Sequence, residues 1–113
     1  MEDGRLEVRY VDPRLRDLVA SDRALRAKFG DVCARKIKIR LSALRAAETL
    51  DDIMNGPGRC HPLKGDYSDC YALRLDGGMR LIFRLENSEE QDRPDITVGV
   101  CILVIDITDY HEG

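Results

Sequence analysis

Two short runs of alternating apolar and polar residues constrain the fold more than any other part of this chain. Tyr71–Leu75 and Met79–Leu85 carry apolar side chains at every second position, which is typical of half-buried strands. A loop of two residues would put the two apolar sets out of phase. The three-residue loop Asp76-Gly77-Gly78 pairs Leu75 with Met79 instead, so the sequence predicts an antiparallel hairpin in this register.

The predicted register places Arg74 directly opposite Arg80, on the face away from the apolar side chains. Like charges that face each other across two strands are destabilising, so we expect an anion such as a phosphate group to compensate them. The alternative is a solvated sheet face on which the two side chains splay apart. We expect Gly78 to provide the positive φ that the loop requires.

The segments on either side of the hairpin predict helices and two further strands. Arg5–Val11 alternates like a half-buried strand, and Ile96–Ile107 is β-branched and apolar on both faces, as an inner strand should be. Between them, cap and stop residues predict a helical turn from Asp12 to Val19, a helix that Ser21 or Asp22 caps and Gly30 ends, a longer helix capped by Asp31, and a last turn that starts with the capping-box pair Thr49 and Asp52. The order β-α-α-β-β-β, with a helical hairpin packed on one face of a mostly antiparallel sheet, predicts an α+β fold in a single domain over residues 1–113.

Composition restricts the classes of function. No apolar run is long enough to span a bilayer, so we expect a cytoplasmic protein without a membrane partner. Two Phe, four Tyr and no Trp disfavour broad binding of single-stranded nucleic acid through stacked aromatic rings. Four cysteines without a Cys-x-x-Cys pair predict reduced, structural thiols, and we expect no metal site.

Charge is unevenly distributed along the chain. Residues 1–84 hold 17 Lys and Arg against 13 Asp and Glu, whereas residues 85–113 hold one Arg against eight acids. The net charge of −3 is unusual for a protein that binds nucleic acid, because phosphate contacts come from a basic surface. A local basic patch would be enough to bind phosphate groups if the acidic stretch 86–95 lies away from it. One side of the longer helix is also basic, and there we expect a solvated surface: Arg35, Lys36, Lys38, Arg40 and Arg45.

Five sequence blocks, taken together and in this order, resemble the HigB branch of the RelE/ParE-type toxin superfamily. The blocks are Leu41-x-x-Leu-Arg-Ala-Ala47, Cys60-His-Pro-Leu-Lys-Gly-Asp66, Tyr71-x-Leu-x-Leu75, Met79-Arg-Leu-Ile-Phe83 and Ile107-x-Asp-Tyr-His111. The resemblance covers roughly residues 5 to 111, and the blocks are far more specific at these separations than any one of them alone.

The resemblance implies a RelE-like fold and a toxin of a bacterial type II toxin-antitoxin system. Such a toxin enters the ribosomal A site and cleaves mRNA, and it needs no cofactor or metal. Its partner is a helix-turn-helix antitoxin that holds it inactive, in some cases as a heterotetramer. Operator DNA is bound only through that antitoxin.

The resemblance also implies a set of site residues. They are catalytic Lys64, Arg74, Arg80 and His111, with substrate-binding Tyr110, His61 and Asp109. Cleavage of RNA by its own 2′-OH needs a base for the hydroxyl proton, cations around the pentacoordinate phosphorane and an acid for the departing 5′-oxygen. Arg74 would clamp the phosphate, Arg80 would neutralise charge and assist proton delivery to the leaving group, and Tyr110 would stack on a base or orient the nucleotide.

Two residues compete for the role of base. His111 is the natural candidate because an imidazole titrates nearest neutral pH, and Lys64 would serve instead if neighbouring cations favoured its neutral amine. Each residue also has a structural explanation, with Lys64 as a turn residue and Asp109 as the end of a strand. The same fold could serve as a binding protein, either a gyrase inhibitor of the ParE type or an interaction module without activity. A pure inhibitor needs no acid or base, so His111 together with Lys64 favours the nuclease.

Overall fold

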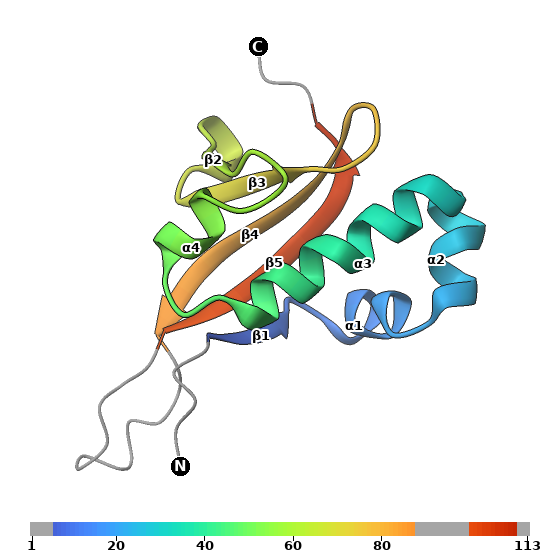
Figure 1. Cartoon of the computed structure of the whole chain (residues 1–113), viewed down its shortest axis with the longest axis horizontal. Coiled ribbons are helices and arrows are strands. Elements are labelled where there is room, and N and C mark those ends of the chain that lie inside the picture. The colour runs from blue at the N-terminus through green and yellow to red at the C-terminus, as the bar shows by residue number, and fades with distance from the viewer. Residues whose placement is uncertain (1–5, 88–99, 111–113) are drawn as a thin grey trace.

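The computed structural model describes residues 6–87 and 100–110. In these residues, the α-helices lie on one side of a five-stranded sheet (Figure 1). The elements in chain order are β1 (Glu7–Tyr10), α1 (Pro13–Val19), α2 (Asp22–Phe29), α3 (Asp31–Ala46), α4 (Leu50–Met54), β2 (His61–Pro62), the 3₁₀ helix η1 (Gly65–Tyr67), β3 (Cys70–Arg74), β4 (Met79–Asn87) and β5 (Val100–Asp109). The predicted α+β class is confirmed.

The sheet has the strand order β1-β5-β4-β3-β2. β1 is parallel to β5, and the other neighbours are antiparallel. The long apolar strand is inner, as predicted, and it is described from Val100, so residues 96–99 of the prediction lie outside the described part of the chain. β2 was not predicted because a strand of two residues, one of them proline, carries no alternating pattern.

The hairpin between β3 and β4 has the predicted register. Leu73 pairs with Leu81, and the N–H of Leu75 donates to the carbonyl of Met79 at 3.0 Å. The prediction of a positive φ at Gly78 was wrong, because the positive φ, 58°, falls on Gly77. The N–H of Met79 closes a turn on the carbonyl of Asp76 at 3.0 Å, and this turn puts Gly77 at the position where a type II′ turn needs a positive φ.

The main core lies between the sheet and the helices. Its completely buried side chains include Leu25 of α2, Leu44 of α3, Leu81 and Phe83 of β4, and Val104 of β5. Their burial at about 25 cal/mol per Å² of apolar surface is the main stabilising term of such a fold. We call this side of the sheet the covered face.

The residues that cap the N-termini of the helices were predicted correctly except at α3. The hydroxyl of Ser21 accepts from the N–H of Ala24 at 3.0 Å and caps α2, and Thr49 begins α4 with the expected capping box. Asp31 is not the cap of α3 but its first residue. Gly30 is the cap because its φ of 84° lets the chain turn sharply between the two helices.

A smaller apolar cluster lies on the opposite side of the sheet. It consists of Leu63, Cys70, Ala72 and Ile82, and none of the described α-helices contributes to it. We call this side the open face.

All four cysteines are free and buried, as the sequence predicted. No helix in the described part of the chain is long and apolar enough to cross a membrane.

The basic side of α3 is not simply solvated, which corrects the prediction. Lys36 forms an ion pair with Asp76 in the hairpin loop at 3.5 Å, and Nε of Arg40 donates to the carbonyl of Arg74 at 2.9 Å. Lys38 and Arg45 also reach neighbouring elements. α3 therefore fixes the position of the hairpin from the covered face.

Candidate functional site

The open face brings four of the predicted site residues together, three of them through strand pairing. Residues that pair across neighbouring strands share one face of a sheet. One such row runs from His61 through Ala72 and Ile82 to Asp106, and the next runs from Arg74 through Arg80 to Thr108. His61, Arg74 and Arg80 therefore lie on the same side as the small apolar cluster.

Arg74 and Arg80 face each other at the shorter of the two spacings found between antiparallel strands, and we call them the narrow pair. The N–H of Arg74 donates away from β4, to the carbonyl of Gly58 at 2.6 Å, and the carbonyl of Arg74 accepts from Arg40. The two arginines are therefore a non-hydrogen-bonded antiparallel pair, whose Cα atoms stand about 4.5 Å apart and whose side chains start closer than in the other kind of pair. Neither arginine forms an ion pair with any residue in the described ranges.

The guanidinium group of Arg80 is held by the hairpin. Its Nη1 donates to the carbonyls of Gly77 at 3.1 Å and Met79 at 3.0 Å. Its Nε is buried and has no hydrogen-bond partner among the described residues. Because arginine has five N–H donors and carbonyls occupy only one of its nitrogens here, the group keeps donors for an anion.

Two tyrosines meet on the open face. Tyr110 packs edge to face on Tyr67, with ring centroids 5.5 Å apart and an angle of 84° between the planes. Both rings pack against the small apolar cluster, and the N–H of Tyr110 donates to the carbonyl of Gly78 at 3.2 Å. Burial and the nearby carboxylate of Asp106 raise the pKa of the Tyr67 phenol. No sequence pattern indicated Tyr67, which lies 43 positions before its partner in the chain.

His61 is oriented by a backbone carbonyl. Its Nδ1 lies 2.9 Å from the carbonyl oxygen of Arg59. A carbonyl only accepts, so this contact assigns the proton to Nδ1. In the neutral ring Nε2 then carries the lone pair, which is the arrangement that a general base requires.

The remaining predicted residues lie at the edges of this site or outside the described residues. Lys64 is exposed and directly precedes η1, where its carbonyl accepts from the N–H of Tyr67 at 3.3 Å. Asp109 pairs with Met79, so strand alternation places it on the other side of β5 from Thr108 and Tyr110. His111 lies outside the described residues.

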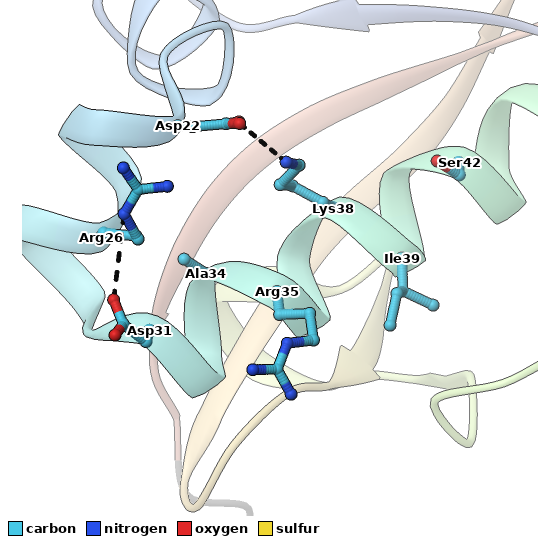
Figure 2. Close-up of a pocket in the computed structure, with 8 residues that line it drawn as sticks. All are labelled: Asp22, Arg26, Asp31, Ala34, Arg35, Lys38, Ile39 and Ser42. Carbon is cyan, nitrogen blue, oxygen red and sulfur yellow. Dashed lines mark hydrogen bonds and ion pairs between the residues drawn. The ribbon is translucent and has the colours of Figure 1, made fainter.

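A groove between α2 and α3 lies apart from this site. This groove has a volume of about 540 Å³, and Nζ of Lys38 lies 2.9 Å from Asp22 and Nε of Arg26 3.9 Å from Asp31. Figure 2 shows the two ion pairs at the groove. No predicted site residue lines it. Within residues 6–87 and 100–110, no three His, Cys, Asp or Glu side chains gather as metal ligands would.

The sequence matches no family model and no curated protein, but solved structures match the fold. The YoeB/ParE toxin from Agrobacterium tumefaciens is 18% identical over 94% of this chain and 100% of its own, with a TM-score of 0.58. A YoeB-YefM complex from Staphylococcus aureus contains a chain that is 16% identical over 96% of this chain and 99% of its own, with a TM-score of 0.56. A heterotetrameric YoeB-YefM toxin-antitoxin complex from the same organism gives a TM-score of 0.54 at 16% identity, with the same coverage of 96% and 99%. The chain therefore has the RelE-like fold of these toxins, as the sequence predicted.

Proposed function

We propose that this protein is a type II toxin of the HigB branch, an endoribonuclease that cuts mRNA on the ribosome without a metal or cofactor. The observation that carries the proposal is the narrow pair of Arg74 and Arg80 on the open face, beside a tyrosine pair and an oriented histidine. Two cations without a carboxylate partner in the described residues fit a phosphate, and a ring surface fits a nucleotide base. The likeness in fold to YoeB/ParE-type toxins supports the same reading.

The two arginines have separate tasks in this mechanism. Attack of the 2′-oxygen on phosphorus forms a pentacoordinate phosphorane with an additional negative charge. Arg74, which is exposed, clamps the phosphate, and Arg80, which two carbonyls hold in place, meets the charge as it develops. A donor that is already in position needs no reorganisation during the reaction, which is why such groups stabilise transition states effectively.

Proton transfer requires a base and an acid. His61 is the candidate base whose ring is oriented within the described residues, because its Nδ1 contacts the carbonyl of Arg59. His111 and Lys64 are the other candidates, and a protonated group among them supplies a proton to the departing 5′-oxygen. The bond from phosphorus to the 5′-oxygen breaks, so the products are a 2′,3′-cyclic phosphate and a 5′-hydroxyl.

The partners follow from the same proposal. The substrate is mRNA in the ribosomal A site, and a helix-turn-helix antitoxin binds the toxin and the operator DNA. The S. aureus YoeB-YefM complex is a heterotetramer, and we propose a comparable assembly for this toxin. The cytoplasm is where ribosomes and this antitoxin would be found.

Cleavage on programmed ribosomes tests the function. The purified protein should cut mRNA in the A site, and Arg80→Gln should lower the single-turnover rate by roughly 10²–10³-fold, as the loss of one preorganised donor does. Arg84→Gln is the matched control, because Arg84 is an exposed arginine on the same strand that already pairs with Glu86. Equal rates for the two variants would argue against the assigned role of Arg80.

The nucleophile can be tested on the substrate alone. An mRNA with a single 2′-deoxynucleotide on the 5′ side of the cut should resist cleavage at that bond and remain cleavable elsewhere. Cleavage at the modified bond would refute the 2′-OH mechanism. A 2′-deoxy substitution two nucleotides away serves as the control.

A second function is favoured by one comparison. The A. tumefaciens neighbour is described as a YoeB/ParE toxin, so a ParE-type inhibitor of gyrase, or a binding module without activity, is the alternative. Induced expression separates the two. Intact transcripts together with signs of DNA damage would identify a gyrase inhibitor, whereas codon-phased cuts detected by primer extension identify the nuclease.

A further inference from the structure

The proposed mechanism leaves one group on the open face without a role. Asp106 pairs with Ile82 across the strands and therefore lies on the same face as Arg80 and Thr108. It is half-buried, and its charge has the wrong sign for a surface that binds phosphate. No cation in the described part of the chain forms an ion pair with it.

Asp106 has a structural role that uses only part of its hydrogen-bonding capacity. Its Oδ1 accepts from the N–H of Ile107 at 2.8 Å. β1 ends where Tyr10 pairs with Val104, so this N–H belongs to the part of β5 beyond the last paired residue of β1. Covering an edge N–H is a common use of a short polar side chain. An ionised carboxylate has about four acceptor positions, so this contact leaves acceptors for a ligand.

Asp106 lies between two different surroundings, a hollow at the edge of β5 that it lines together with Arg14 and Lys28, and the aromatic side of the small apolar cluster. A register shift next to Ile82 gives β5 one extra residue, Ile105, which packs with Tyr67 and Tyr110 in the small apolar cluster. The phenol of Tyr67 also lies close enough to Asp106 to feel its charge. Asp106 therefore shares the open face with the arginine pair, next in sequence to a residue that packs with both rings.

We propose that Tyr67, Tyr110 and Asp106 form a subsite that selects the base of the nucleotide next to the cut, with guanine preferred and uracil disfavoured. The rings supply contact to any base. The carboxylate discriminates because guanine offers two adjacent donors, its ring N–H and its amino group, whereas uracil offers a single N–H between two carbonyls that a carboxylate repels. The inference rests on the proposed function and adds to it a residue that determines specificity.

Asp106→Asn is the decisive variant. Its amide oxygen can still accept from Ile107, so the sheet edge keeps its hydrogen bond, but its amide group replaces acceptors with donors. On ribosomes programmed with A-site codons that differ only at the position next to the cut, the ratio of guanine to uracil cleavage rates should fall about tenfold or more, since a good bidentate contact contributes ~1–3 kcal/mol of discrimination. Asp51→Asn, the same change at an exposed carboxylate of α4 outside the subsite, should leave that ratio unchanged.

The outcomes separate this inference from the proposed function. A chain that cuts no codon at all would overturn the nuclease, and the subsite is then tested by binding of 5′-GMP and 5′-UMP to the free protein. Stronger perturbation of the Tyr67 and Tyr110 ring resonances by 5′-GMP, reduced in Asp106→Asn, supports the subsite. A cleavage ratio that Asp106→Asn leaves unchanged, or equal effects of the two nucleotides, overturns it. Equal melting temperatures of the variant and the unaltered chain show that folding is intact.

Discussion

The two faces of the same sheet differ in what their side chains do. In the described part of the chain, sixteen buried residues on the covered side form one core with the helices, whereas the cluster on the open face has four. Neighbours in the chain belong to opposite sides, since Leu73 is buried in the core and Arg74 is exposed, and Leu81 is buried beside Arg80. Strand alternation therefore lets β3 and β4 stabilise the fold and present charge at the same time. Changes on the covered face should therefore lower stability, and changes on the open face should lower the rate of cleavage.

The largest effect on stability is expected at Phe83. This side chain is completely buried in the covered face and stacks on Tyr71 with ring centroids 5.5 Å apart. Phe83→Ala should lower the free energy of unfolding by about 3–5 kcal/mol, measured by urea denaturation. A loss below about 1 kcal/mol, the size expected of a surface change, would mean that the covered face does not carry the stability of the fold.

Arg74→Glu should separate stability from cleavage. It replaces two like charges with an opposite pair across the strands, which should stabilise the hairpin by about 0.2–1 kcal/mol. The same change puts a carboxylate where the phosphate should bind, so cleavage should fall by at least roughly 10²-fold. Urea denaturation and single-turnover cleavage measure the two effects. A variant that is both less stable and fully active would reverse the assignment of the open face.

Arg40→Ala tests how the covered face positions the site. Nε of Arg40 donates to the carbonyl of Arg74, and its side chain passes so close to Gly58 that an added Cβ there would stand 2.6 Å from Nε. Loss of this charged hydrogen bond should lower stability by about 1.5 kcal/mol, and cleavage should fall because Arg74 loses its support. Lys38→Ala, on the same helix but bonded to Asp22 rather than to the hairpin, is the control that should leave cleavage unchanged.

The smallest effect concerns the exposed pair of Asp22 and Lys38. The hydrogen bond and charge of Lys38 lower the pKa of Asp22 below its ordinary value of 3.8. A carboxyl whose folded pKa is lowered stabilises the protein above its unfolded pKa and loses that contribution as pH falls through the folded value. Urea midpoints at pH 5 and near pH 3 should therefore differ less in Asp22→Asn than in the unaltered chain. An identical dependence on pH in both would show that the pair of Asp22 and Lys38 does not contribute to stability.

The sequence predicted those parts of the site whose position depends only on the alternation of apolar and polar residues within neighbouring strands. The hairpin register, and with it the pairing of Arg74 with Arg80, follows from apolar spacing over about a dozen residues, a range in which strand period is decisive. Asp109 could not be placed this way, because its side of the sheet depends on the pairing of β5 with β4 and on the register shift near Ile82. Tyr67 and Asp106 were missed for the same reason, since tertiary contacts and not their neighbours in sequence bring them together.

The turn and the cap were misplaced for a different reason. A glycine pair such as Gly77 and Gly78 permits a positive φ at either residue, so composition cannot choose between them. The same holds for the boundary between α2 and α3, where both Gly30 and Asp31 are good cap residues. In each case hydrogen bonds within the folded chain decide.

A double-mutant cycle of Arg74 and Arg80 in single-turnover cleavage shows whether the two guanidinium groups bind the same phosphate. If both guanidinium groups bind one phosphate, each single change to Ala removes most of the rate and the double variant loses little more, because residues that act as a unit are strongly non-additive. Urea denaturation of the same proteins should show a stability within about 0.5 kcal/mol of the unaltered chain for Arg74→Ala, as is usual for an exposed side chain. Independent effects that simply multiply, or single variants that cleave at the full rate, would show that the two arginines do not share a substrate.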